Sequence, residues 1–342
     1  YANIRRLIGD GKAVTPNAVR IEEMINYFRY DYAQPTDGRP LAIETNIGSC
    51  PWDEGKSLVH IGLQARKVST DKIPPLNLVL LVDVSGSMES PDKIPLLRAA
   101  LREFAGSLRK EDRLSLVTYA GSAGVVLPPT SGVHKIAIEN AIMRLSAGGG
   151  TNGGRGILTA YDLARENFDE ASINRVILAT DGDFNVGLSN TEDLLSLIRG
   201  QRDSGIYLTV LGLGTGNIND DLMEQLADMG NGIYTYLDSL AEARKVLMEQ
   251  AGSSFVPVAN DVKVQVEFDP DLVKSFRQVG YENRQLKNED FSNDRKDAGE
   301  MGAGHQVTAL YEVELTRALL PLEPLGEVRL RYKLPGDSNN EQ

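Results

Sequence analysis

Three oxygen-bearing side chains occupy alternate positions in the stretch LVDVSGSM (81–88). They are Asp83, Ser85 and Ser87, and they come directly after the apolar run 78–82. A carboxylate and two hydroxyls at this spacing can converge on one small cation. Since all three are oxygen donors, the cation would be a hard one. The rest of the chain must then supply the other half of the site.

Two later segments carry matching chemistry. The apolar run in NRVILATDGD (174–183) ends in acids, and GGGTNGG (148–154) places a threonine among glycines that let backbone approach closely. Taken together, the candidate ligands are all oxygen donors, without His or Cys: Asp83, Ser85, Ser87, Thr151 and Asp181. Such a set suits Mg²⁺ best, with Mn²⁺ or Ca²⁺ as alternatives.

The middle of the chain, about 76–253, has the pattern of an α/β domain. Apolar runs such as 77–85 are typical of strands buried on both faces, and they alternate with segments of helical periodicity. Ser90 and Pro91 predict the start of the first of these helices. The alternation predicts a doubly wound, Rossmann-like, mostly parallel sheet, and residues 113–130 predict a hairpin that adds an antiparallel edge strand.

This architecture predicts where the candidate ligands meet. In an open α/β sheet, ligands bind beyond the carboxyl ends of the strands, where the strand order reverses. The order 3-2-1-4-5-6 places that reversal between the first and fourth strands, which end in DVSGS and TDGD. We therefore expect Asp83 and Asp181 to face each other across one crevice.

The two flanks, 1–75 and 254–342, differ from the middle. Segments 41–48, 58–68 and several after 260 alternate apolar and polar residues, as half-buried antiparallel strands do. Two N-terminal strands are too few for a stable sheet. We therefore expect both chain ends to form one β-sandwich-like domain, with N-terminal helices beside it and the α/β domain, 76–253, inserted.

The combined pattern resembles the metal-ion-dependent adhesion site of von Willebrand factor type A domains. D-x-S-x-S, a later Thr in a glycine-rich loop and T-D-G after a strand are all present. The resemblance implies that Ser85 and Ser87 are direct ligands and that Thr151 ligates when a partner is bound. It further implies that Asp83 and Asp181 act directly or through water, and that an Asp or Glu carboxylate of a protein partner completes the coordination.

The flanks resemble those of bacterial exported von Willebrand A proteins, which are often lipoproteins. RIEEMINYF, PWDE, DVKVQVEFDP, GYENR and DAGEMGAGHQVTALYE carry this likeness. It implies an exported protein of the periplasm or cell surface. The sequence lacks the lipobox cysteine of such lipoproteins, so attachment to a membrane would need an anchor outside this chain.

Composition excludes other classes of function. A net charge of −12 over 342 residues argues against nucleic acid as a partner, because phosphate binding needs a basic surface. The sequence holds no apolar run of about 18 residues that could span a membrane.

Trp52, in PWDE, is expected to anchor the sandwich, or to mark a contact surface if it is exposed.

Several alternatives fit less well. Residues 181–192 partly match an EF-hand calcium loop, but Val186 stands where Gly is needed. No G-x-G-x-x-G follows the first strand, and Ser85 lacks the G-x-S-x-G setting of a hydrolase nucleophile. The sequence therefore predicts a non-enzymatic, metal-dependent protein-binding module. An adaptor for an AAA-type ATPase is the second reading, and a Mg²⁺-dependent hydrolase is the third.

Overall fold

The structure is a computed structural model, and its chain forms two compact units. One unit comprises Ser69–Phe255, and the other comprises Asn3–Val68 together with Val256–Gln342. The structure describes residues 1–16, 19–148, 153–182, 191–214, 220–250, 256–281, 285–293, 298–320 and 323–335. Each unit is described by itself below.

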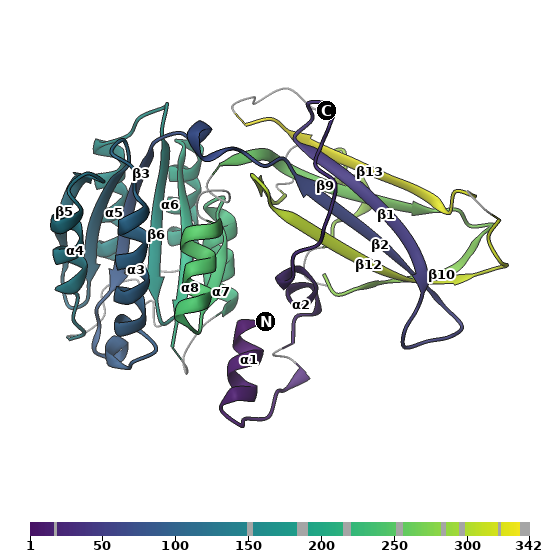
Figure 1. Cartoon of the computed structure of the whole chain (residues 1–342), viewed down its shortest axis with the longest axis horizontal. Coiled ribbons are helices and arrows are strands. Elements are labelled where there is room, and N and C mark those ends of the chain that lie inside the picture. Colours follow the sequence, from purple (N-terminus) through teal and green to yellow (C-terminus); the bar gives the residue numbers. More distant parts are fainter. Residues whose placement is uncertain are drawn as a thin grey trace. The chain divides into compact units, whose positions relative to one another are not determined.

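The first unit is built on a six-stranded sheet of order β5-β4-β3-β6-β7-β8 (Figure 1). All neighbouring strands pair in parallel except β4 and β5, which form the expected antiparallel hairpin. Every residue of β3 and β6 is buried, which explains the apolar runs 78–82 and 176–179 within them. The strands are β3 (Leu76–Asp83), β4 (Arg113–Tyr119), β5 (Ala123–Ser131), β6 (Ile173–Thr180), β7 (Ile206–Leu213) and β8 (Tyr234–Leu237).

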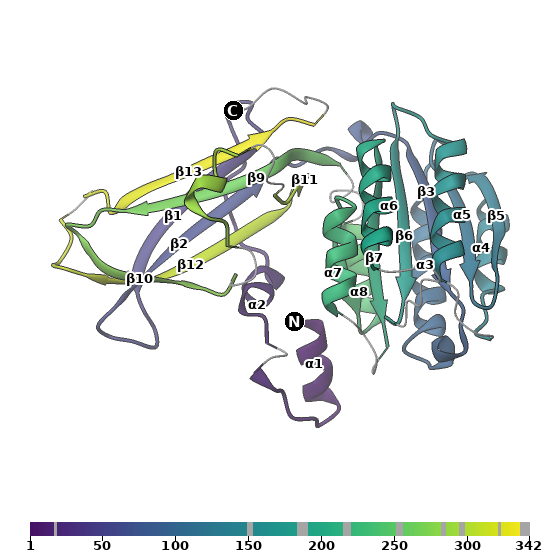
Figure 2. The ribbon, with the colours of Figure 1, turned by 180° about the vertical axis from the view of Figure 1, so that it is seen from behind.

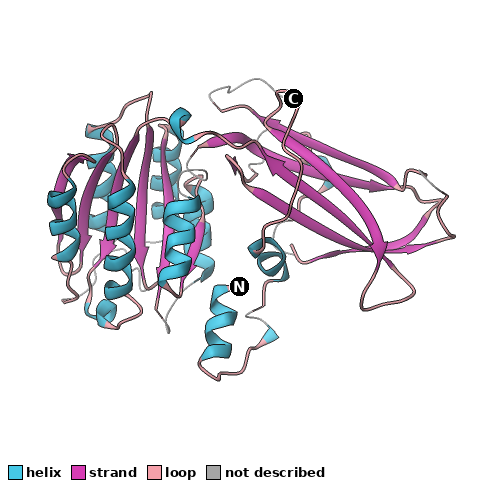
Figure 3. Cartoon of the chain, viewed as in Figure 1, coloured by secondary structure: helices cyan, strands magenta, loops and turns pink. Residues whose placement is uncertain are grey.

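Helices cover both faces of this sheet, so the unit is a doubly wound α/β domain (Figures 2 and 3). One side carries α5 (Gly153–Glu166), α6 (Thr191–Asp203) and α7 (Asp220–Met229). The others are α3 (Ile94–Ser107), α4 (Lys135–Met143) and α8 (Leu240–Arg244), and α3 lies beside both α4 and α8. Short turns of other helix types occur at η2 (Thr70–Lys72), η3 (Gly86–Glu89) and η4 (Lys245–Gln250).

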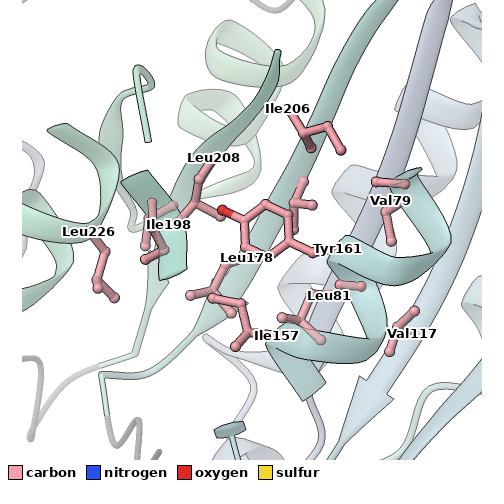
Figure 4. Close-up of a cluster of buried hydrophobic side chains, with 14 of the residues drawn as sticks. Val79, Leu81, Val117, Ile157, Tyr161, Leu178, Ile198, Ile206, Leu208 and Leu226 are labelled. Atoms are coloured by element: carbon pink, nitrogen blue, oxygen red, sulfur yellow. The ribbon is translucent and has the colours of Figure 1, made fainter. Parts of the chain in front are cut away.

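The core between the sheet and the helices α5, α6 and α7 is almost entirely aliphatic (Figure 4). Leu81 of β3, Ile157 of α5 and Leu226 of α7 are each fully buried in it. Tyr161 places an aromatic ring in the same cluster. This packing holds β3 and β6, the two strands that lead to the candidate ligands, rigidly side by side.

The predicted strand order 3-2-1-4-5-6 is confirmed, with β3 as the first strand and β6 as the fourth. The predicted helix start at Ser90 and Pro91 is wrong. Residues 91–93 form a turn, and α3 begins at Ile94 with Lys93 as its N-cap residue. The turn adds backbone between η3 and α3, and it brings Lys93 to the end of the sheet where Asp83 lies.

The second unit is a β-sandwich of two antiparallel sheets. One sheet has the order β1-β2-β12-β10, and the other has the order β11-β9-β13. N-terminal and C-terminal strands thus pair directly, as expected, with Ile61 opposite Ala309. The strands are β1 (Leu41–Ser49), β2 (Ser57–Ala65), β9 (Pro257–Phe268), β10 (Val273–Val279), β11 (Met301–Gly302), β12 (Gln306–Leu315) and β13 (Gly326–Lys333).

Side chains of both sheets share the core of this sandwich. Leu63 and Ala65 of β2 pack with Val258 and Ala259 of β9, so the sheets face each other. A second apolar cluster includes Val313 of β12. The short helical turn η6 (Asn288–Asp290) precedes β11 in the chain. The expected fold class, an α/β domain inserted into a β-sandwich made from both chain ends, is confirmed.

Short helices precede β1, and the one nearer to β1 contacts β12 of the four-stranded sheet. The helices are α1 (Ala2–Gly9) and α2 (Ile21–Tyr27). Asn26 accepts a hydrogen bond from the backbone N–H of Thr308 at 2.7 Å, which joins α2 to β12. The Tyr32 hydroxyl lies 2.7 Å from both His60 Nε2 and Thr308 Oγ1. These contacts give His60 a structural role.

Candidate metal centre

Asp83 is the last residue of β3, and its carboxylate is completely buried. Its Oδ1 accepts a hydrogen bond from the backbone N–H of Ser85 at 2.8 Å. Its Oδ2 accepts hydrogen bonds from the Tyr119 hydroxyl at 3.2 Å and from the Thr180 hydroxyl at 3.3 Å. Three neighbouring strands, β3, β4 and β6, therefore fix the position of this one carboxylate.

The two serines follow on a tight turn. The Ser85 and Ser87 hydroxyl oxygens are 3.0 Å apart, and Ser85 is 2% exposed while Ser87 is open to solvent. Met88 is fully buried and donates its backbone N–H to Ser85 O at 3.0 Å, which anchors the turn. The two hydroxyls are thus close enough to bind one small cation, as the spacing predicts.

Asp181 follows β6 and is 4% exposed. Its Oδ2 lies 2.9 Å from Lys93 Nζ, and the same ammonium donates a hydrogen bond to the backbone carbonyl of Ser87 at 2.8 Å. Lys93 therefore joins the turn after β3 to the residue after β6. The structure brings both predicted acidic segments to the same edge of the sheet.

The electrostatics of this edge favour a cation. Burial raises the pKa of the Asp83 carboxyl, and the nearby Asp181 carboxylate raises it further, while hydrogen bonds from Ser85 and Tyr119 oppose the shift. Burial also raises the pKa of the Tyr119 hydroxyl well above its ordinary value. An ionised Asp83 is costly in this setting unless a positive charge approaches it.

The residues present fit a hard divalent cation. The described donors are two carboxylates and two hydroxyls, which is the oxygen chemistry that Mg²⁺ prefers. Within the described part of the chain, no group of three or more His, Cys, Asp or Glu could hold a metal ion. The fit thus depends on a mixed set of hydroxyls and carboxylates and not on an acidic cluster.

Thr151, the fifth predicted ligand, lies outside the described residues, as do residues 183–190 of the partial calcium-loop match. The segment that leads to Thr151 does reach the site. Gly148 donates its backbone N–H to Val84 O at 2.8 Å, beside Asp83. Thr151 therefore stays a prediction, whereas Asp83, Ser85, Ser87 and Asp181 are placed at one edge of the sheet.

Sequence reasoning missed Lys93. Lys93 is the single basic residue between the serine turn and the apolar positions of α3. The predicted helix start placed it inside a helix, so it was not counted among the residues of the site.

Trp52, by contrast, shows both expected properties. Its indole N–H donates to Glu312 of β12 at 2.7 Å, yet the side chain is 57% exposed.

Taken together, the fold and this edge define a Rossmann-like α/β domain whose candidate ligands lie at the switch point of its sheet. The von Willebrand factor type A domain family matches residues 77–249, and the chain belongs to this family. Two further families match the flanks. One is described as von Willebrand factor (residues 1–60), and the other as the C-terminal part of the uncharacterized protein YfbK (residues 253–342).

Bacterial proteins are similar along most of the chain. YfbK of Escherichia coli K12 is 42% identical over 322 residues, which is 92% of this chain and 56% of YfbK. The protein sll0103 of Synechocystis is 26% identical over 284 residues, 81% of this chain and 66% of that protein. The chain thus spans little more than half the length of the E. coli relative. The predicted likeness to bacterial von Willebrand A proteins is confirmed.

A solved structure agrees with the fold. The von Willebrand factor type A protein from Catenulispora acidiphila aligns with a TM-score of 0.52 at 19% identity, covering 90% of this chain and 72% of that one. Among the described helices, none has the length and apolar character needed to cross a membrane.

Proposed function

We propose that this chain is a metal-dependent protein-binding module. Membership of the von Willebrand factor type A family supports a role in protein–protein interaction. The metal dependence, the identity of Mg²⁺ and the carboxylate ligand are our proposal. The observation that carries it is the fully buried Asp83 carboxylate, which has the Ser85 and Ser87 hydroxyls on one side and a second carboxylate, Asp181, nearby.

In this proposal, Ser85, Ser87 and Thr151 hold Mg²⁺ through neutral oxygens, and Asp83 and Asp181 hold it directly or through water. The bound ion supplies a Lewis-acidic position for an Asp or Glu side chain of a partner. Tyr119 and Thr180 keep the Asp83 carboxylate oriented through its Oδ2. Met88 keeps the serine turn closed by its buried side chain.

A binding role fits the contacts of the hydroxyls better than a catalytic one. The Ser85 hydroxyl hydrogen-bonds the Ser87 hydroxyl and has no described histidine beside it that could take its proton. We therefore propose a non-enzymatic protein. An exported location, at the periplasm or cell surface, belongs to the same proposal and rests on the resemblance to exported relatives.

The test is Mg²⁺ binding to the wild-type chain and to Asp83→Asn, measured by titration calorimetry. Asn keeps the shape of the side chain and one oxygen for the Ser85 N–H, but it carries no charge. We expect the wild type to bind Mg²⁺ and Asp83→Asn to lose most of its affinity. In EDTA, the variant should unfold at the same or a higher temperature, because it removes a buried charge.

The partner is sought by pull-down from an envelope fraction with the wild type, in Mg²⁺ and in EDTA. Asp83→Asn in Mg²⁺ is the matched control. A partner retained only by the wild type in Mg²⁺ supports the proposal. Equal Mg²⁺ binding by both proteins would contradict the assignment of Asp83, and recovery of an ATPase would favour an adaptor role.

A further inference from the structure

Lys93 places a positive charge inside the candidate metal centre. Its Nζ lies 2.9 Å from Asp181 Oδ2 and 2.8 Å from the backbone carbonyl of Ser87. Its side chain is only 15% exposed, although Lys is usually among the most solvated residue types. A solvated surface lysine would be free to leave the site, whereas this one is held against both halves of it.

The aliphatic part of the Lys93 side chain packs closely against Gly214, directly after β7. A Cβ atom at Gly214 would lie 2.0 Å from Lys93 Cε, 2.7 Å from its Cγ and 2.8 Å from its Cδ. Gly214 also has a φ of +79°, which favours glycine. The Tyr236 hydroxyl donates to the Gly214 carbonyl at 2.7 Å and so fixes this backbone. Strand β7 thus carries a surface against which the lysine stem lies.

The ammonium changes the charge that a bound cation meets. Asp83 and Asp181 contribute two negative charges when ionised, and Lys93 offsets one of them. A divalent ion at this site is then left with a surplus positive charge that an incoming carboxylate can neutralise. Without Lys93, the two carboxylates alone would match the charge of the ion, and a third carboxylate would gain less.

We propose that Lys93 determines the ligand preference of the site: it weakens the hold on the divalent cation and strengthens the hold on the partner's carboxylate. This inference rests on the proposed function, since it concerns the same metal centre. The inference predicts opposite effects when the charge of Lys93 is removed: the affinity for the divalent cation rises, and the affinity for the partner's carboxylate falls.

A purely structural role for Lys93 gives a different result. If the lysine only joins Ser87 to Asp181, its removal loosens both segments, and the affinities for metal and for carboxylate fall together. If its charge matters, metal affinity rises. The change is on the order of tenfold, because one unit charge near a divalent ion is worth at least about that much in a solvated setting.

The experiment uses the full chain with Lys93→Met, which keeps an unbranched stem, and Lys93→Gln, which keeps a hydrogen-bond donor. Lys110→Met is the matched control. Lys110 is 80% exposed and precedes β4, at the opposite end of the sheet from Asp83, so it removes the same charge away from the site. Mg²⁺ affinity is measured by calorimetry. The Mg²⁺-loaded proteins are then titrated with a short peptide containing one Asp, and with its Asn counterpart.

We expect both Lys93 variants to bind Mg²⁺ about tenfold more tightly than the wild type and the Asp peptide about tenfold more weakly. Lys110→Met should match the wild type in both titrations. Because the variants leave Asp181 without the ammonium, Mg²⁺ should also raise their melting temperature by more than it raises that of the wild type.

Unchanged or weaker Mg²⁺ binding in both variants, with a folded circular dichroism spectrum, would overturn the role of Lys93 and leave the proposed function intact. Absence of Mg²⁺ binding in the wild type would instead overturn the proposed function and this inference with it. If Lys93→Met is unfolded, Lys93→Gln alone decides, because its side chain retains a hydrogen-bond donor.

Discussion

Glu312 is a heavily paired carboxylate of the sandwich, and its replacement by Gln should cost stability in a pH-dependent way. The side chain, on β12, is 4% exposed. It accepts hydrogen bonds from Arg277 Nη2 at 2.6 Å, Trp52 Nε1 at 2.7 Å and Lys56 Nζ at 3.2 Å. Trp52 and Lys56 lie between β1 and β2, and Arg277 lies on β10, so one carboxylate ties three parts of the sheet together.

The pKa of Glu312 gives the magnitude. Hydrogen bonds from Arg277, and then from Trp52, are the leading causes that lower this pKa from an ordinary 4.5 to about 2. Without solvent screening, such a fall would correspond to roughly 3 kcal/mol of stability from the ionised form. The Arg277 side chain is 64% exposed, so solvent screens its charge. We therefore expect Glu312→Gln to cost about 1–2 kcal/mol at pH 7.

The sign of the pH dependence follows from the lowered pKa. The carboxylate stabilises the fold fully above the pKa of the unfolded chain, near 4.5, and this contribution is lost as the pH falls through about 2. The difference in unfolding free energy between wild type and Glu312→Gln should thus be full at pH 7 and vanish between about pH 4.5 and 2. Other acids titrate alike in both proteins and cancel in the difference.

Trp52 provides the assay, because it is the chain's single tryptophan and belongs to this unit. Urea unfolding followed by its fluorescence reports the sandwich rather than the α/β unit. Glu314→Gln, two residues along β12 and 37% exposed, is the matched control and should change the stability much less than Glu312→Gln does. A loss below 0.5 kcal/mol for Glu312→Gln, or a loss that persists at pH 2, would refute the reasoning.

Two further changes test the packing of each unit. The buried Tyr161 hydroxyl has no hydrogen-bond partner among the described residues, so Tyr161→Phe should raise the unfolding free energy by about 0.5–2 kcal/mol in urea followed by far-UV circular dichroism. A loss of stability there would mean that the hydroxyl has an essential partner. A Cβ at Gly62 would lie 2.5 Å from Tyr32 Cζ, so Gly62→Ala should cost about 1–3 kcal/mol in the Trp52 assay. Gly48→Ala on the neighbouring strand meets nothing within 4 Å and should cost no comparable amount, and equal effects would argue against the Tyr32 contact.

The α/β unit could be predicted well from the sequence because strands that are buried on both faces contain long apolar runs. Strands β3 and β6 are buried throughout, and polar residues begin where each strand ends. Once the strand order was fixed by the rules of doubly wound sheets, Asp83 and Asp181 had to meet. Four of the five predicted ligands therefore fell at one edge without knowledge of any loop conformation.

The sandwich was predictable only in outline. Alternation shows that a strand has one buried face, but it does not choose a neighbour. The sequence indicated that β1 and β2 need C-terminal partners, and β12 and β10 fill that role. It did not indicate that β9 and β13 would leave this sheet and form the facing one. That choice is made by contacts such as Leu63 with Val258, which are distant in the chain.

Lys93 shows why a motif of oxygen ligands describes only half of a metal centre. Ligand types and spacing can be read from a sequence because they lie on strand ends, whose positions the sheet fixes. The charge that modifies those ligands comes from a side chain whose reach depends on backbone detail: a turn at 91–93 and a glycine at 214 with a positive φ. A helix starting at Pro91, as the Ser-Pro pair suggests, would place Lys93 within the first turn of the helix and not at its N-cap. The three-residue delay in the start of α3 is thus a local irregularity with a chemical consequence, since it sets the net charge that a cation beside Asp83 would meet.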